Sequence, residues 1–258
     1  MLHITEEDLR EQQTEWERNF CREKSTKLYK YRNDIYRDLL TLQNNLIYVP
    51  DRKQLNDPNE SCLNLSNVYD SIHIYESQYN KAGNESLEKE IRHFFDGFGV
   101  FSMCKNPKEE CLWSYYSNGH RGFCIEYDAK ILWDSFVRQK ISACVLEVSY
   151  EAQREVATMD NIRSYIQKPI DFLRKTTSSK SIKWNGEQEV RFILNVKSQY
   201  INIPRDSVTG IYIGERCSDD DKILIKKYVN SIGNSRLKLY QMYFSKDSFD
   251  MYFEEIAL

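Results

Sequence analysis

The chain has 258 residues and a formal net charge of −3, from 36 basic and 39 acidic side chains. This balance excludes the strong overall basic field that draws a protein to nucleic acid, and the length suffices for one large domain or two small ones. The first residues, Met-Leu-His-Ile-Thr-Glu-Glu-Asp, lack the apolar segment of a signal peptide, and no apolar run is long enough to span a membrane. We therefore expect a cytoplasmic protein that does not associate with membranes.

Cysteine usage agrees with this expectation. The seven Cys residues include no C-x-x-C pair, which argues against a disulfide framework and against structural zinc. Cys104, Cys111 and Cys124 lie close to His120 in the sequence, but tetrahedral zinc favours tighter paired spacing. We expect buried, reduced thiols and no metal site.

The predicted elements begin with a helix over residues 5–24, which opens with a capping-box pattern at Thr5 and Asp8. Hydrophobic periodicity and turn residues predict the elements that follow. In chain order they are strand 28–32, helix 34–44, strand 46–49, loop 51–67, helix 86–95, strands 99–104 and 122–127, helix 130–139, strand 143–150, helix 161–176, strands 187–195 and 208–213, helix 219–232 and strand 237–244.

Strands and helices are both abundant but do not alternate strictly, which favours an α+β fold over a doubly wound sheet. We predict a mixed or split central sheet with flanking helices. Residues 1–27 are predicted to form an N-terminal helical extension, and residues 28–258 a single α+β domain of catalytic type.

The segment 183–193, Lys-Trp-Asn-Gly-Glu-Gln-Glu-Val-Arg-Phe-Ile, carries the most specific pattern. On a strand with period two, Glu187 and Glu189 point the same way and Arg191 continues their row. Two carboxylates on one face raise each other's pKa unless a cation lies between them, and such a pair can stabilise positive charge or take a proton. An exposed edge strand whose glutamates pair with Arg191 and Lys183 would give the same pattern.

Two earlier segments suit an anionic ligand. Lys30 and Arg32 share one face of a predicted strand with Tyr31 between them, and such a pair can bind a phosphate or pyrophosphate. Asn56 and Asp57 precede a proline in a strong turn signal, which either braces a loop or holds ribose hydroxyls. Composition and turn chemistry alone favour the structural alternatives, a partly solvated strand for the first segment and a loop brace for the second.

The segment 112–126 joins aromatic residues to a cationic turn. Trp113 and Tyr116 are one helical turn apart, and Asn118-Gly119 forms a turn before His120 and Arg121. Rings can stack on the aromatic side chains while phosphates meet Arg121 and backbone N–H groups. His120 is either a proton donor or a hydrogen-bonded structural residue.

In this order the motifs resemble those of a bacterial family of domains of unknown function, family 2971, over about residues 28–213. The motifs that carry the resemblance are K-Y-R from Lys30, N-D-P-x-E from Asn56, W-x-x-Y from Trp113, H-R-G-F-C-I from His120 and K-W-x-x-E-x-E-x-R from Lys183.

More distantly, this layout is similar to the ADP-ribosyltransferase superfamily. Those enzymes carry a His or Arg on an early strand, an aromatic or Ser/Thr element in the middle, and a Glu, often as E-x-E, before a late strand. The resemblance implies that Lys30 or Arg32 takes the early position, with Tyr31 beside it, and that Ser102 or Tyr116 takes the middle one. This sequence departs from the pattern in having Lys30 where one branch has His, and in lacking a Ser-Thr-Ser triplet.

The late position falls to Glu189 as the catalytic carboxylate, with Glu187 as its companion. The resemblance implies that Glu189 stabilises the oxocarbenium-like cation formed when the nicotinamide–ribose bond of NAD breaks, and that Glu187 activates the acceptor. The resemblance implies that Lys30 and Tyr31 complete the catalytic residues. The residues expected to bind NAD are Arg32, Asn56, Asp57, Ser102, Trp113, Tyr116, His120, Arg121 and Arg191.

These implications predict transfer of ADP-ribose from NAD, as substrate, to a protein or nucleic-acid acceptor, with no metal. A toxin or anti-phage effector is the expected context, and an antitoxin or defence-system partner would then be expected; oligomerisation is left open. Two other functions stay open: a nucleotide- or nucleic-acid-binding sensor without transfer chemistry, and a metal-dependent nuclease or hydrolase. The hydrolase would use Asp57, Glu60, Glu187 and Glu189, and would lose its activity with EDTA.

Overall fold

The computed structural model describes residues 26–57, 87–153 and 167–257, together with residues 7, 10, 11, 160, 163 and 164. The predicted helix 5–24 lies outside the described residues except for Glu7, Arg10 and Glu11, which are helical. Of the extension predicted over residues 1–27, Thr26 and Lys27 are also described, and Lys27 begins the first described strand instead of belonging to a helix. The second half of the N-D-P-x-E motif also lies outside the described residues.

The described elements follow the predicted order closely. The strands are β1 (Lys27–Arg32), β2 (Leu46–Val49), β3 (Gly99–Cys104), β4 (Phe123–Asp128), β5 (Ser142–Glu147), β6 (Ser149–Glu151), β7 (Ser179–Ser181), β8 (Glu189–Leu194), β9 (Gln199–Asn202), β10 (Val208–Ile213), β11 (Lys238–Phe244) and β12 (Met251–Glu255). The helices are α2 (Ile35–Gln43), α4 (Leu87–Asp96), α5 (Glu110–Tyr116), α6 (Ala129–Arg138), α8 (Pro169–Thr177) and α9 (Asp219–Ile232), with 3-10 turns η1 (Arg52–Gln54), η2 (Ile182–Glu187) and η3 (Arg205–Ser207).

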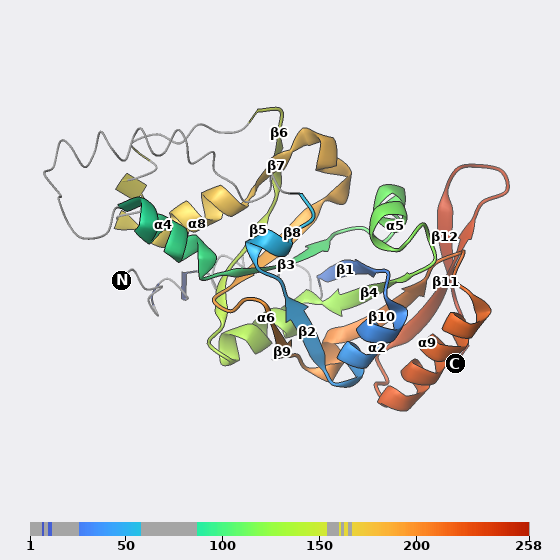
Figure 1. Ribbon diagram of the computed structural model, residues 1–258. Coiled ribbons are helices and arrows are strands. Elements are labelled where there is room, and N and C mark those ends of the chain that lie inside the picture. Colours follow the sequence, from blue (N-terminus) through green and yellow to red (C-terminus); the bar gives the residue numbers. More distant parts are fainter. Residues whose placement is uncertain are drawn as a thin grey trace, which may run out of the picture.

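One large sheet organises these elements, with the strand order β12-β11-β10-β4-β1-β3-β8-β5 (Figure 1). Its neighbours run antiparallel except β10 and β11, which are parallel and are connected through α9. Two small sheets, β2–β9 and β6–β7, stand beside it. The fold is therefore α+β with a mixed sheet, as predicted.

The sheet is nearly split between β1 and β3. These two strands share a single residue pair, Tyr29 with Cys104, whereas β1 pairs with β4 from Lys27 to Arg32. Where the backbones separate, the Nζ atom of Lys30 donates a hydrogen bond of 2.5 Å to the carbonyl oxygen of Ser102 on β3. In a continuous ladder, a backbone N–H of the neighbouring strand would donate to this carbonyl oxygen. Here the side chain of Lys30 does so instead, and the carbonyl group is not left without a hydrogen bond, which would be costly.

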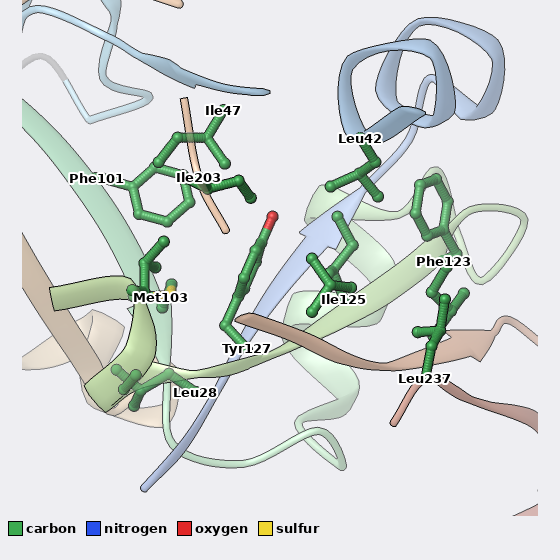
Figure 2. Packing of buried hydrophobic residues seen from close by; sticks show 14 of the residues in the cluster. Leu28, Leu42, Ile47, Phe101, Met103, Phe123, Ile125, Tyr127, Ile203 and Leu237 are labelled. Carbon is green, nitrogen blue, oxygen red and sulfur yellow. The ribbon is translucent and has the colours of Figure 1, made fainter. Parts of the chain in front are cut away.

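The main hydrophobic core covers one face of the sheet. Alternate strand residues such as Leu28, Phe101 and Tyr127 pack there against α2, α6 and α9 (Figure 2). The opposite face carries two smaller clusters. One joins α4 and α8 to β5 and β8, and the other joins α5 to β1, β4 and β10. The region between these two clusters lies beside the β1–β3 split.

Period-two alternation on β8 is as predicted from Glu189 onward. Val190 and Phe192 belong to the main core, while Glu189 and Arg191 point to the other face. The prediction was wrong about Glu187, which ends the 3-10 turn η2 instead of lying on the strand. Gln188 has a φ of 43°, in the left-handed region, and this reversal interrupts the strand before Glu189.

Other predicted boundaries also need correction. The predicted strand 143–150 is two strands in different sheets, since β5 ends at Glu147 and β6 pairs with β7. The predicted helix 161–176 is interrupted at Lys168, because a residue before proline disfavours the helical backbone and Pro169 begins α8. Strands β7, β9 and β12 were not predicted.

Candidate active site

A cavity of about 250 Å³ lies at the split between β1 and β3. Its wall takes residues from both small clusters, among them Val100 from one and Leu112 from the other. Most of the predicted site residues also line it: Lys30, Tyr31, Arg32, Asn56, Ser102, Tyr116, Glu187 and Glu189. Segments far apart in the sequence therefore converge on one cavity that is open to solvent.

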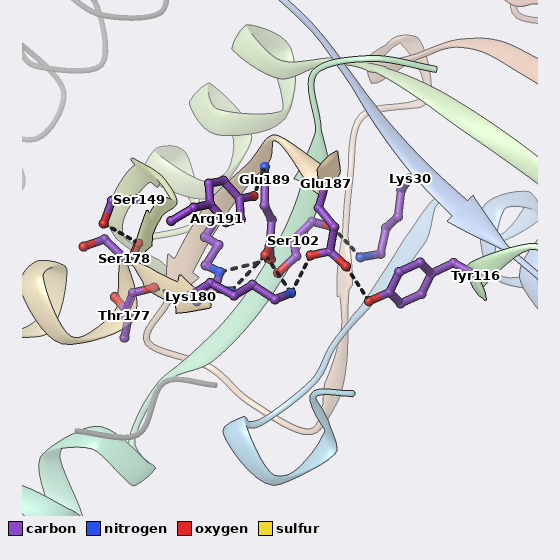
Figure 3. Close-up of polar contacts among 11 residues, drawn as sticks. Lys30, Ser102, Tyr116, Ser149, Thr177, Ser178, Lys180, Glu187, Glu189 and Arg191 are labelled. Carbon is purple, nitrogen blue, oxygen red and sulfur yellow. Dashed lines mark hydrogen bonds and ion pairs between the residues drawn. The ribbon is translucent and has the colours of Figure 1, made fainter. Parts of the chain in front are cut away.

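Glu187 and Glu189 share the ammonium group of Lys180 (Figure 3). The Nζ atom of Lys180 forms a short ion pair with Oε2 of Glu187 and lies 3.4 Å from Oε2 of Glu189. All three side chains are buried. The cation that the sequence analysis required between two like charges is thus a residue of the protein itself.

Local backbone geometry brings the two carboxylates together. In η2, the hydroxyl of Ser181 accepts a hydrogen bond from the backbone of Lys183, and the turn ends at Glu187. The left-handed Gln188 then redirects the chain into β8, where Glu189 pairs with Cys104 of β3. Glu187 and Glu189 therefore meet through a turn and a strand start rather than through strand alternation.

Glu189 is fixed from the buried side. The guanidinium of Arg191 binds its carboxylate with two hydrogen bonds, of 3.0 and 2.9 Å, and also donates to the carbonyl oxygen of Thr177. The backbone N–H of Glu189 donates to the hydroxyl of Tyr150 at 2.8 Å. Burial raises the pKa of Glu189 above its ordinary value, whereas the charge of Lys180 and a hydrogen bond from Ser102 oppose that rise.

Opposing effects also act on the two cations. Burial alone would lower the pKa of Lys180, but the charges of Glu189 and Glu187 outweigh it and raise the pKa. Burial lowers the pKa of Arg191, and the charge of Asp57 acts in the opposite direction. The guanidinium stays protonated in its paired geometry with Glu189, because arginine is not deprotonated in proteins.

Glu187 is held from the α5 side of the cavity. The hydroxyl of Tyr116, the last residue of α5, donates a hydrogen bond of 2.9 Å to Oε1 of Glu187. The side chain of Asn56 also hydrogen-bonds Tyr116. Burial and the charge of Glu187 raise the pKa of the Tyr116 hydroxyl, which is thus a hydrogen-bond donor at neutral pH.

Lys30 and Arg32 place positive charge on the β1 side. Burial lowers the pKa of Lys30 to about 7, and the charge of Arg32 acts in the same direction. The ammonium of Lys30 also lies 4.5 Å from the ring centroid of Phe101. In the described part of the chain, the buried Nε atom of Arg32 has no hydrogen-bond partner. The sequence analysis gave either Lys30 or Arg32 as the early cationic residue of the site. In the structure both line the cavity.

The cationic turn after α5 lies elsewhere. Trp113 is fully buried, donates from Nε1 to the carbonyl oxygen of Pro107 at 2.7 Å and stacks near His120. His120 is buried with its Nε2 atom unpaired among the described residues, and burial lowers its pKa. Arg121 is exposed and bonds to the carbonyl oxygen of Asn118. Trp113, His120 and Arg121 do not line the cavity.

Three further predicted residues have supporting positions. Arg191 lies behind Glu189 and does not line the cavity, and Asp57 acts on Arg191 through its charge. Tyr31 lines the cavity, but its hydroxyl donates to the carbonyl oxygen of Asn106 and its ring packs on Trp113 with centroids 5.1 Å apart. These contacts make Tyr31 a wall residue whose hydroxyl is already bonded.

Lys180 is the site residue that sequence reasoning missed. It lies on β7, a strand of three residues between Ser179 and Ser181, and nothing in that polar stretch distinguishes it from Lys183 or other surface lysines. Tyr29 was also missed, although its place on β1 beside Lys30 could have suggested it. Among the described residues, no group of three or more His, Cys, Asp and Glu side chains could hold a metal ion.

Comparison with known proteins gives one match. Residues 112–192 match a family model described as protein of unknown function (DUF2971), which confirms the family resemblance drawn from the motifs. No curated protein and no solved structure matches the chain. Within the described part of the chain, no helix is long and apolar enough to cross a membrane.

Proposed function

We propose that this chain, whose residues 112–192 match the model of the DUF2971 family, is an ADP-ribosyltransferase-like enzyme that cleaves NAD and transfers ADP-ribose to a macromolecular acceptor. One observation carries the proposal. Lys30 on β1, Ser102 on β3 and Glu189 on β8 come from three neighbouring central strands and line one cavity. These are the early, middle and late elements that the resemblance requires, in the same chain order.

Each wall of the cavity offers what one part of NAD needs. Lys30 and Arg32 supply positive charge for the pyrophosphate, since ammonium and guanidinium groups bind phosphate oxygens. Tyr29 and Tyr116 offer ring surfaces for a base or for nicotinamide. In this proposal Tyr116 and Tyr29 take the stacking role, because Trp113 is fully buried.

The carboxylates face the reacting ribose. As the bond between C1 of the ribose and the nicotinamide nitrogen breaks, its electron pair leaves with neutral nicotinamide and positive charge develops on the sugar. Glu189, fixed by Arg191 and Ser102, stabilises that charge. The acceptor then forms a bond to C1 and gives its proton to Glu187, whose Oε1 atom is oriented by Tyr116. Water as acceptor would give hydrolysis instead of transfer.

The test is release of nicotinamide from NAD by purified protein in the presence of EDTA, with wild type beside Glu189→Gln. We expect release by the wild type and a loss of at least about 100-fold in the variant, as for removal of a group that stabilises transition-state charge. Tyr115→Phe is the matched control, because Tyr115 is exposed and adjoins the site on α5. Absence of release by every protein would contradict the proposal.

A second candidate function rests on a specific observation. Every carboxylate oxygen of Glu187 and Glu189 already accepts a hydrogen bond or ion pair from Tyr116, Lys180 or Arg191. A fully neutralised pair beside Lys30 and Arg32 suits a nucleotide-binding sensor without transfer chemistry. That function predicts a rise in melting temperature with NAD or another nucleotide that Glu189→Gln preserves, and no nicotinamide release.

The cellular role is part of the same proposal. NAD cleavage would suit a toxin or an anti-phage effector acting in the cytoplasm, restrained by an antitoxin or another partner of a defence system. Expression of the wild type and of Glu189→Gln in a bacterial host tests this role. Growth arrest with loss of cellular NAD is expected for the wild type, and equal arrest by both proteins would contradict it.

A further inference from the structure

The position of the Lys180 ammonium identifies a cation-binding site. Its Nζ atom lies between the facing oxygens of Glu187 and Glu189, and only 3% of the Lys180 side chain is exposed. The same atom lies 5.1 Å from the ring centroid of Trp184. Two carboxylates and an indole face therefore surround one positive charge.

The other hydrogen-bond donors to Glu187 and Glu189 leave the space between the two carboxylates to Lys180. Tyr116 occupies Oε1 of Glu187, and Arg191 binds Glu189 from the buried side. The Oε2 atoms turn toward the cavity residue Lys180. Without Lys180, two buried negative charges would face each other with one guanidinium to balance them, and their repulsion would be strong at low dielectric.

The surroundings favour an organic cation over a metal ion. Hard metal ions require several oxygen ligands, and no group of three or more His, Cys, Asp and Glu side chains in the described ranges could hold one. An indole face attracts ammonium, guanidinium and pyridinium groups through its quadrupole. Trp184 is half-buried and does not line the cavity, but a cation that takes the place of the Lys180 ammonium would lie as close to its ring as that ammonium does.

We propose that Glu187, Glu189 and Trp184 form a binding site for a monovalent organic cation, which the ammonium of Lys180 occupies until a ligand displaces it. The inference rests on the proposed function in one respect, that a positively charged ligand group comes to this carboxylate pair. Lys180 is then an internal competitor, and the affinity of the site for a cation is set by how firmly Lys180 is held.

Lys180 comes from an element that can yield more readily than the main sheet. It lies on β7, which has three residues and pairs only with β6 in a small separate sheet within the described chain. Arg191 differs from it in this respect, since it lies on a central strand and its guanidinium is also bonded to the carbonyl oxygen of Thr177. Displacement of Lys180 would leave the pairing of Arg191 with Glu189 intact.

The test is calorimetric titration with 1-methylnicotinamide, a pyridinium cation without phosphate, with neutral nicotinamide as the uncharged comparison. Lys180→Met removes the competing ammonium and should bind the cation about tenfold more tightly than wild type, a difference of about 1.4 kcal/mol. Lys183→Met, which removes an exposed lysine from the same turn, should bind like wild type. Neutral nicotinamide should not distinguish the variants. An unchanged or lower affinity for the cation in Lys180→Met would overturn the proposal.

Because Lys180→Met leaves two buried carboxylates without their shared cation, a second measurement uses the wild-type protein. Limited acetylation of lysines, mapped by mass spectrometry, should modify Lys180 slowly in the free protein and several-fold faster with saturating 1-methylnicotinamide, while the acetylation rate of Lys183 stays unchanged. A rate at Lys180 that does not rise would overturn the proposal independently of folding in the variant.

Neither measurement requires turnover, so failure here and failure of the proposed function can be distinguished. Tighter cation binding without nicotinamide release from NAD would establish the cation site and refute the transferase. Nicotinamide release with no effect of Lys180→Met on cation affinity would support the enzyme and refute the internal competitor.

Discussion

The guanidinium of Arg191 binds the carboxylate of Glu189 through two hydrogen bonds, from Nε to Oε1 at 3.0 Å and from Nη2 to Oε2 at 2.9 Å, and Arg191 has no exposed surface. Removing one partner of a buried pair leaves an uncompensated charge. Arg191→Met should therefore lower the free energy of unfolding by about 3–5 kcal/mol. Chemical denaturation measures this loss.

A double-mutant cycle separates the pair from general packing. If the unpaired carboxylate causes the loss, Glu189→Gln in the Arg191→Met background should restore part of the stability. Equal instability of the single and double variants would contradict the interpretation, and would assign the role of Arg191 to its contact with the carbonyl oxygen of Thr177.

The hydrogen bond from Tyr116 to Glu187 gives a second prediction. Tyr116→Phe keeps the ring but removes the 2.9 Å bond to a buried carboxylate, and should cost about 1.5–3 kcal/mol of unfolding free energy. Tyr115→Phe, one residue earlier and 66% exposed, should change stability by less than about 0.5 kcal/mol. Similar values for the two variants would show that the Tyr116 hydroxyl does not hold Glu187.

Lys30 predicts a pH dependence of stability. Its pKa falls from 10.5 to about 7 in the folded protein, chiefly through burial, so the folded state binds this proton more weakly than the unfolded chain. The resulting cost is fully present below about pH 7 and disappears as the pH rises toward the unfolded value. Wild type should therefore gain stability relative to Lys30→Met between about pH 6 and about pH 9, by about 1 kcal/mol after allowance for solvent screening.

Urea denaturation across this pH range measures the difference, with Lys183→Met as the baseline for loss of a surface lysine. The stability of wild type relative to Lys30→Met could instead stay constant or fall as the pH rises. Either result would show that Lys30 holds its proton at least as firmly in the folded protein as in the unfolded chain.

The close contact between the backbones of Gly122 and Arg32 gives a fourth prediction. A Cβ atom at this position would lie 2.0 Å from the carbonyl oxygen of Arg32, so Gly122→Ala must displace β1 or the start of β4. We expect a loss of at least about 2 kcal/mol, and weaker binding of any ligand that contacts Arg32. Gly233→Ala is the matched control, because Gly233 has a φ of 63° with open space around it and should cost only about 1 kcal/mol. Thermal unfolding of the two variants compares them.

Local patterns predicted the elements that carry strong periodicity. Asp34 caps α2 through a hydrogen bond to the backbone of Arg37, and β10 and α9 have their predicted bounds. The α+β class and the mixed sheet followed from the order of these elements. Most of the described cysteines are buried, as expected.

The candidate site was predictable only in part. Glu189 and Lys30 were singled out because like charges recur at period two on their predicted strands, whereas Ser102 was implied only by the resemblance. Lys180 could not stand out, since its importance depends on a contact with Glu189 nine residues away that only the turn η2 creates. Gln188 likewise gave no signal of its left-handed backbone, so Glu187 was placed on a strand.

The position of the cationic turn, residues 118–121, could not be predicted from the sequence either. Arg121 was interpreted as a phosphate ligand and His120 as a proton donor or a structural residue, because a glycine turn and aromatic residues surround them in the sequence. The side of α5 that faces the cavity is set by packing, and Trp113 turns toward Tyr31 and His120 in the hydrophobic cluster while Tyr116 turns toward Glu187. Sequence spacing placed both aromatic residues on one helical face and could not separate their roles.

The most direct measurement of the central claim follows the fate of NAD labelled in its adenosine half, incubated with the protein, EDTA and a cell lysate that supplies acceptors. We predict that wild type moves the label from NAD to macromolecules or to free ADP-ribose, and that Glu189→Gln leaves it in NAD. Label that stays in NAD with wild type, at concentrations where calorimetry shows NAD to be bound, would contradict the account and leave a nucleotide-binding site without chemistry.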